Sequence, residues 1–210
     1  MFTKEKYSNG AYELNYAVDY PKNFDENKKY PVLFYFHGMG MVRQGIDYVI
    51  RECPARQEYI PDDLDFIIVA PSCDDYMWFE NFNNVIGFIK YIEDKSYVDN
   101  KKCFIGGASM GGYTCWLLAV LHSELFAGAV ICCGGGLYWA AEDINIPIIA
   151  VHGDMDDSVL PRESEIMVEK MKECGKDATL IIKKGYGHDV WTETFSDPDT
   201  YRWMNEQLVH

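Results

Sequence analysis

The fold is decided by residues 102–113, which read Lys-Cys-Phe-Ile-Gly-Gly-Ala-Ser-Met-Gly-Gly-Tyr. A short apolar run enters a turn of small residues, and a helix-forming run over 114–121 leaves it. A serine at the apex of such a turn has a strained backbone, and its neighbours two positions away must lack side chains for strand and helix to pack closely. We therefore interpret residues 107–111 as a nucleophile elbow with Ser109 at its apex. The alternative is a glycine-rich turn without a chemical role.

The composition is that of a globular protein of ordinary domain size. The chain has 210 residues, of which 48% are hydrophobic and 25% charged, so we predict a single domain over residues 1–210. No apolar run reaches the roughly 18 residues that a membrane span requires. Residues 1–10 carry charge without an apolar core after them, so we expect no secretory signal and no membrane partner. The formal net charge of -14 argues against a nucleic-acid partner, whose phosphates would be repelled.

The seven cysteines are an odd number, and several lie in apolar runs where a thiol packs as a small hydrophobic group. We expect them to be reduced and the protein to be cytoplasmic. The cysteines lack the paired spacing of zinc sites. A metal site could be built from His37, His152, His188 and the acids of 154–157, but no pair of histidines at helical spacing supports it. We therefore predict neither a metal nor a cofactor.

Buried β-rich runs alternate with helical patterns along the chain. We predict strands over 11–20, 31–36, 65–70, the run before Gly107, 126–133, 147–151 and 178–183, and helices over 44–51, 83–95, 114–121, 161–174 and 201–208. This order predicts an α/β fold with one doubly wound, mostly parallel sheet and helices on both faces. Active-site residues of such folds gather at the carboxyl ends of the strands, where we expect Ser109, His37, Asp156 and His188 to converge.

A serine nucleophile needs a base within hydrogen-bond reach and a carboxylate that fixes the tautomer of that base. His188 is the best candidate base, because it follows the last predicted strand in a glycine-rich turn. The other histidines are His210 at the terminus, His122 at the end of a helix and facing solvent, and His37 and His152, which close strands and are expected to be structural. For the carboxylate, local physics alone leaves Asp154, Asp156 and Asp157 open.

Four motifs carry a family resemblance. They are His37-Gly38-Met39-Gly40, the elbow with Gly112, residues 152–159 (His-Gly-Asp-Met-Asp-Asp-Ser-Val) and residues 187–191 (Gly-His-Asp-Val-Trp). In this order they span about residues 31–191, and the chain resembles the α/β-hydrolase superfamily. It is similar to the small, lidless group that includes feruloyl and acetyl-xylan esterases, acyl-protein-thioesterase-like carboxylesterases and the catalytic domain of prolyl oligopeptidases.

The resemblance implies an α/β-hydrolase fold without a cap domain, and it selects Asp156 as the acid through the family pattern His-Gly-x-x-Asp-x-x-Val. An oxyanion must be met by donors already in place. The backbone N–H of Met110, just after the nucleophile at a helix start, supplies one donor. By analogy with the family, Met39 supplies the second, although only Gly38 and Gly40 stand where some esterases have three glycines.

The loops that follow the strands bear on the substrate. Only about a dozen residues separate the strand ending near Cys133 from the one at Pro147, where lipases of this fold often place a lid, so we expect an open or shallow site. We predict substrate contacts from Trp78, Trp139 and Trp191, with Tyr76 and Tyr138 on the same rim. The alternative is that each aromatic residue only packs its loop.

We therefore predict a serine hydrolase that cleaves a carboxylic ester of a small molecule or of a group linked to a carbohydrate, of the feruloyl or acetyl esterase type. A peptidase or thioesterase with the same triad is the alternative among enzymes. A hydrolase-like binding module is the alternative outside enzymes, although no triad residue is lost.

Overall fold

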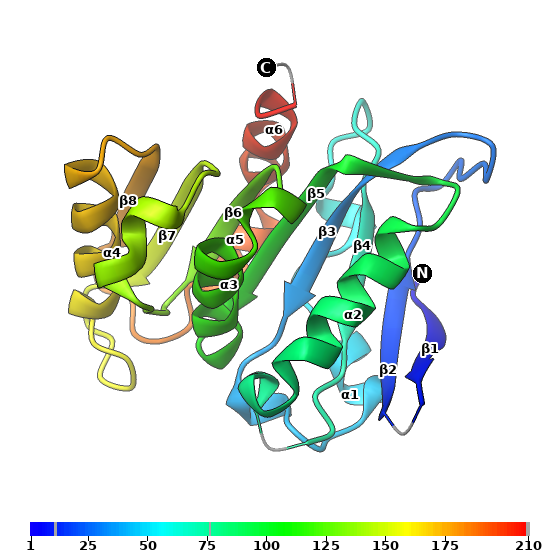
Figure 1. Cartoon of the computed structure of the whole chain (residues 1–210), viewed down its shortest axis with the longest axis horizontal. Coiled ribbons are helices and arrows are strands. Elements are labelled where there is room, and N and C mark those ends of the chain that lie inside the picture. Colours follow the sequence, from blue (N-terminus) through cyan, green and yellow to red (C-terminus); the bar gives the residue numbers. More distant parts are fainter. Residues whose placement is uncertain (11, 76, 209–210) are drawn as a thin grey trace.

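The computed structural model describes residues 1–10, 12–75 and 77–208. Its centre is one eight-stranded sheet with the order β1-β2-β4-β3-β5-β6-β7-β8 (Figure 1). The strands are β1 (Thr3–Asn9), β2 (Tyr12–Asp19), β3 (Tyr30–Phe36), β4 (Ile67–Pro71), β5 (Val98–Ala108), β6 (Gly128–Cys132), β7 (Ile148–Gly153) and β8 (Ala178–Lys183). The pairs that involve β2 are antiparallel and the others are parallel, so the predicted mostly parallel α/β sheet is confirmed.

Helices cover both faces of the sheet (Figure 1). One face packs against α2 (Phe82–Glu93), α3 (Met110–Leu121) and α4 (Arg162–Glu173), and the other against α1 (Ile46–Glu52), α5 (Trp191–Ser196) and α6 (Pro198–Glu206). Short 3-10 helices complete the connections: η1 (Met39–Met41), η2 (Gln57–Tyr59), η3 (Trp78–Asn81), η4 (Ser123–Leu125) and η5 (Tyr138–Asp143). In the described part of the chain, no helix has the length and apolar character needed to cross a membrane.

Strand β3 shows why its sequence forms a central strand. Phe34 and Phe36 enter the core beneath α2 and α3, while Leu33 and Tyr35 enter the core on the opposite face. Alternation of side chains between two buried faces requires a continuous apolar run, as in parallel strands covered on both sides. This strand delivers His37 to the carboxyl edge of the sheet.

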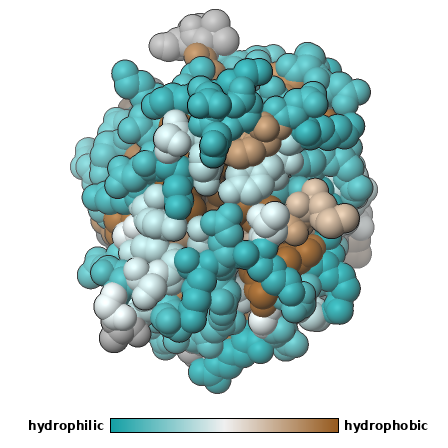
Figure 2. Space-filling model, turned by 90° about the vertical axis from the view of Figure 1, so that its right-hand side faces the viewer, coloured by the Kyte–Doolittle hydropathy of each residue, from teal (hydrophilic) through white to brown (hydrophobic). Residues whose placement is uncertain are grey.

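The sequence-based prediction missed one strand and one α-helix of the described chain. Strand β1 is an edge strand whose Lys4, Glu5 and Lys6 are mostly exposed, with Tyr7 as its buried residue. Its pairing with β2 supplies the structure that its own polar sequence does not indicate, and charged side chains discourage pairing with another chain. Figure 2 shows this side of the molecule, where the surface is largely hydrophilic. Helix α5 was also missed, and Ala11, the first residue of a predicted strand, lies outside the described residues.

The carboxyl edge of the sheet is not covered by a further domain in the described residues. Between β6 and β7, the connection contains only η5. The predicted absence of a cap domain therefore agrees with the architecture, and the loops that follow β3, β5, β7 and β8 meet at this edge.

Candidate active site

Ser109 lies at the sharp turn between β5 and α3. Its backbone has φ 55° and ψ -120°, and its N–H donates to the carbonyl of Cys132 at 3.0 Å. A positive φ at a residue other than glycine costs on the order of 1–3 kcal/mol and persists only where the surroundings impose it. A Cβ on Gly111 would lie 1.9 Å from the carbonyl oxygen of Phe36, so only glycine lets α3 approach β3 this closely. The structure therefore has the strained, tightly packed elbow that the sequence predicts.

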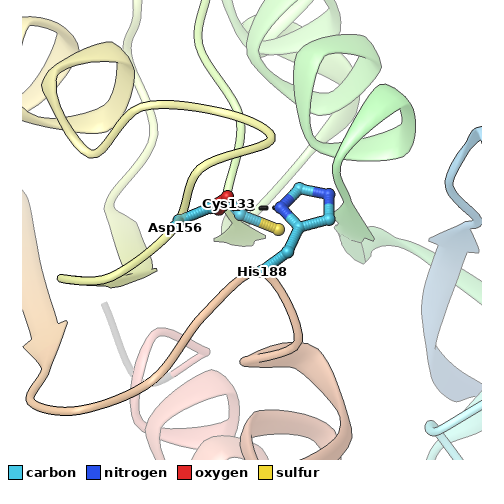
Figure 3. A group of neighbouring side chains, drawn as sticks. All are labelled: Cys133, Asp156 and His188. Atoms are coloured by element: carbon cyan, nitrogen blue, oxygen red, sulfur yellow. Dashed lines mark hydrogen bonds and ion pairs between the residues drawn. The ribbon is translucent and has the colours of Figure 1, made fainter.

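Asp156 and His188 meet from the loops after β7 and β8. Nδ1 of His188 donates to Oδ2 of Asp156 at 2.7 Å, and the other ring nitrogen points away from the carboxylate (Figure 3). The backbone N–H groups of Ser158 and Val159 donate to Oδ1 of Asp156 at 2.9 and 3.0 Å. Burial opposes ionisation of Asp156, but the bonds from His188, Val159 and Ser158 outweigh it and hold its pKa below the ordinary value. The carboxylate thus remains charged and fixes the tautomer of His188 with Nε2 available.

A second histidine supports the same carboxylate. His152 is fully buried, and its Nε2 lies 3.1 Å from Oδ2 of Asp156 and 2.9 Å from the carbonyl of Val159. Because a carbonyl only accepts, Nε2 carries a proton. Nδ1 lies 2.7 Å from Oγ of Ser164, which donates to the carbonyl of Gly134 at 2.8 Å. His152 therefore holds the loop that carries Asp156, in agreement with a structural role.

His37 anchors the loop on the other side of Ser109. Its Nδ1 donates to the carbonyl of Gly38 at 2.8 Å, and its Nε2 accepts the N–H of Cys73 at 3.0 Å. Desolvation lowers the pKa of this buried imidazole to about 4, so it is neutral. The loop continues into η1, whose first residue is Met39, while Met110 begins α3. The first N–H groups of a helix have no partner inside it, so the N–H groups of both residues predicted for the oxyanion hole have no partner within their own helix.

Ser109, His188 and the predicted donor loop line one pocket of about 360 Å³. Ser109 and His188 are on its wall together with Met39, Met41 and Trp191, and its remaining lining residues are Tyr35, Gly38, Gly40, Ala108 and Ser158. The volume lies within the usual range for small-molecule sites. None of these lining residues is an aspartate, glutamate, lysine or arginine.

The three tryptophans predicted to contact substrate have three different environments. Trp191 lines the pocket, with its ring centroid 5.3 Å from that of His188 in an edge-to-face arrangement. Trp78 does not reach the rim: it is 2% exposed, and its indole N–H donates to the carbonyl of His37 at 3.0 Å. The apolar ring is buried beneath the donor loop, so the expected rim position is wrong. Trp139 is 69% exposed and packs against Tyr138 rather than lining the pocket.

The acids and histidines left over lie elsewhere. Asp154 accepts the N–H of Gly185 at 2.7 Å and so caps the turn after β8, while Asp157 is exposed. His122 is half-buried and lies 3.2 Å from Glu124, rather than facing solvent freely. Tyr76 and His210 lie outside the described residues.

Sequence reasoning missed Ser164, Ser158 and the thiol of Cys133, which lies close to Asp156 and His188. For Ser158 the only signal was its place in the motif that follows Asp156. Nothing local marks Ser164 or Cys133, because their positions depend on which elements pack together.

A mostly parallel sheet with a strained elbow serine, and with an acid and a histidine joined after later strands, defines the α/β-hydrolase class. The chain belongs to the prolyl oligopeptidase family, whose model matches residues 79–136 and 137–208. In the described residues, the matched segments include the positions of Ser109, Asp156 and His188, but not the donor loop after His37.

Individual relatives are distant. A probable feruloyl esterase C of Aspergillus oryzae is 26% identical over 201 residues, covering 89% of this chain and 72% of the relative. Dipeptidyl-peptidase 5 of Porphyromonas gingivalis is 21% identical over 240 residues, but the chain spans only 34% of its length. The crystal structure of a thermostable esterase superposes with a TM-score of 0.81 at 24% identity, covering 98% of this chain and 62% of the esterase. This last likeness concerns the fold.

Proposed function

We propose that the protein is a serine hydrolase that cleaves carboxylic esters through an acyl-enzyme. The observation that carries the proposal is the hydrogen bond of 2.7 Å between His188 and Asp156 at a pocket that also exposes Ser109. The family match and the feruloyl esterase relative support the same class of reaction.

In the proposed mechanism, Oγ of Ser109 attacks the ester carbonyl carbon while Nε2 of His188 takes the hydroxyl proton. The carbonyl oxygen becomes an oxyanion that the N–H groups of Met110 and Met39 bind. His188 then gives its proton to the leaving alkoxide, and the ester C–O bond breaks. Water, deprotonated by His188, hydrolyses the acyl-enzyme and restores Ser109. Asp156 stays ionised throughout and stabilises the imidazolium.

The pocket supports an uncharged acyl group as substrate. Met39, Met41 and Trp191 offer apolar and aromatic surface, which suits an aryl or short acyl chain. We place the enzyme among esterases of the feruloyl or acetyl type, acting on a small or carbohydrate-linked ester. Since all seven cysteines are free thiols, we propose a cytoplasmic setting. Because the described strands form one eight-stranded sheet, we also propose a single domain.

The test combines labelling by a fluorophosphonate with turnover of p-nitrophenyl acetate. Ser109→Ala should abolish labelling and lower kcat by at least about 1000-fold, because the nucleophile is lost. Asp156→Asn should lower kcat by about 10⁴-fold, because the amide no longer selects the correct tautomer of His188. The matched control is Ser96→Ala, which removes an exposed hydroxyl before β5, at the opposite edge of the sheet. Full activity in Ser109→Ala, or equal losses in Ser96→Ala, would refute the mechanism.

A peptidase with the same triad is the second candidate, because the matched family is named for prolyl oligopeptidases and one relative is a dipeptidyl-peptidase. Parallel assays on an aryl ester, a thioester and an aminoacyl amide compare the candidates. Preferential kcat/KM for the amide would replace the esterase proposal.

A further inference from the structure

A thiol lies beside the pair formed by Asp156 and His188. Strand β6 lies between β5, which leads to Ser109, and β7, which leads to the loop of Asp156, so the residue after β6 falls between nucleophile and acid. That residue is Cys133, and its backbone has φ 41°, a conformation that L-residues seldom adopt. Figure 3 shows its sulfur next to the hydrogen bond that joins Asp156 to His188.

The three side chains offer one donor atom each of three different kinds. The sulfur of Cys133, a carboxylate oxygen of Asp156 and a ring nitrogen of His188 all lie within 4.8 Å of one another. In tetrahedral zinc sites these donors bind at about 2.0–2.3 Å, which brings them to roughly 3.5 Å from each other. Small shifts of the side chains therefore suffice to place all three around one cation.

We propose that Cys133, Asp156 and His188 form an inhibitory site for a thiophilic divalent cation such as Zn²⁺ or Cd²⁺. Sulfur and imidazole donors favour such ions over Mg²⁺ and Ca²⁺, which take oxygen ligands. The cation replaces the proton that Nδ1 of His188 shares with Asp156 and the proton of the Cys133 thiol, and both protons go to solvent. A thiolate and a carboxylate then balance its two positive charges.

The remaining bonds of Asp156 show why one oxygen is available. Oδ1 keeps the backbone N–H groups of Ser158 and Val159. Oδ2, which also lies 3.1 Å from Nε2 of His152, binds the cation in place of the His188 proton. The side chain of His188 is 24% exposed, whereas those of Cys133 and Asp156 are buried. His188 lies on a loop whose residues 184–187 are exposed. A cation therefore enters when this loop moves the ring outward.

Binding would stop catalysis without occupying the pocket of the substrate. With Nδ1 on the metal, the ring loses the hydrogen bond to Asp156 that orients it, and the charge that stabilises the imidazolium is neutralised. Inhibition rests on the proposed function, but binding does not, so the two are measured separately.

Binding is measured by titrating Cd²⁺ into the full chain and following the ultraviolet charge-transfer band of a cadmium thiolate. The background is Cys174→Ala, which removes the one exposed thiol among the seven free cysteines. In that background, adding Cys133→Ala should abolish the band and weaken binding by at least about 100-fold, because a ligand is lost. Cys133→Ser keeps the volume of the side chain and serves if the alanine variant unfolds. A band that persists without the Cys133 thiol, or no band with it present, overturns the site.

Inhibition is measured as ester turnover and fluorophosphonate labelling with Zn²⁺ present and after a chelator is added. Protein with Cys133 should lose turnover and labelling when Zn²⁺ is added and regain them with the chelator. Cys133→Ala should retain turnover and labelling at the same zinc concentration. Cadmium binding at Cys133 without loss of turnover would overturn the inhibitory role while leaving the site. A protein that binds cadmium there but never turns over an ester would instead contradict the esterase proposal.

Discussion

The same dipeptide, His-Gly, follows β3 and ends β7, and the two copies use the imidazole in opposite ways. Nε2 of His37 accepts a backbone N–H, whereas Nε2 of His152 donates to a carbonyl and faces a carboxylate. His37 holds the proposed oxyanion loop, and His152 holds the loop of Asp156. The comparison teaches that partners contributed by distant segments, and not the local sequence, decide whether Nε2 of a buried histidine donates or accepts a hydrogen bond.

Replacing the glycine of each dipeptide by alanine should give the largest difference in stability between the two regions. In Gly153→Ala, the new Cβ would lie 2.2 Å from the carbonyl oxygen of Gly187 and 2.3 Å from that of Tyr186. We expect the free energy of unfolding to fall by about 3 kcal/mol or more, since backbone must move. Turnover should fall as well, because the displaced loop carries His188. Urea unfolding and p-nitrophenyl acetate hydrolysis measure both effects.

Gly38→Ala is the matched change at the other dipeptide. Its Cβ would lie 3.3 Å from Ser109 Cβ and from the carbonyl oxygen of Ala108. A shift of a few tenths of an ångström relieves these contacts, so we expect a loss of about 1 kcal/mol. Equal destabilisation by the two alanines would contradict the proposed difference in packing.

The pH dependence of stability should report His37. Burial lowers its folded-state pKa to about 4, while an unfolded histidine titrates near about 6.5. As the pH falls from 6.5 to 4, the unfolded chain binds a proton at this histidine that the folded chain does not. The free energy of unfolding therefore falls by up to about 3 kcal/mol.

Urea unfolding at a series of pH values measures this slope, with His37→Gln expected to flatten it. NMR of the His37 ring gives an independent measure in the wild-type protein. Its ring should stay neutral between pH 7 and pH 5. Protonation within that interval would contradict the lowered pKa of the buried His37 ring.

Ser164→Ala tests the side-chain contact that distinguishes His152 from His37. The buried hydroxyl supports Nδ1 of His152, whereas both ring nitrogens of His37 bond to backbone. Its loss should cost about 1 to 2 kcal/mol through an unsatisfied buried group. Thermal unfolding beside Ser96→Ala measures the difference. If Ser164→Ala is no less stable than Ser96→Ala, the hydroxyl of Ser164 does not stabilise the buried ring of His152.

Much of the fold could be predicted from the sequence, because buried parallel strands such as β3 and β7 are continuous apolar runs. Ser109 and His188 could be proposed because each lies in a local motif, whereas Asp156 was separated from Asp154 and Asp157 only by the family resemblance. Strand β1 could not, since its charged residues form a strand only through pairing with β2. Trp78 was misplaced because an aromatic residue in a loop gives no sign of whether the loop folds over it. Cys133 was missed because its neighbours come from strand order, which local patterns do not contain.

The arrangement of the site along the chain bears on biosynthesis. Ser109 is translated near the middle of the sequence, and the loop with His188 follows the last strand, after residue 183. A nascent chain therefore carries the proposed nucleophile for some 80 further residues before its base is made. The serine remains unactivated during that interval, so the proposed hydrolytic activity would begin only after the loop with His188 has been made.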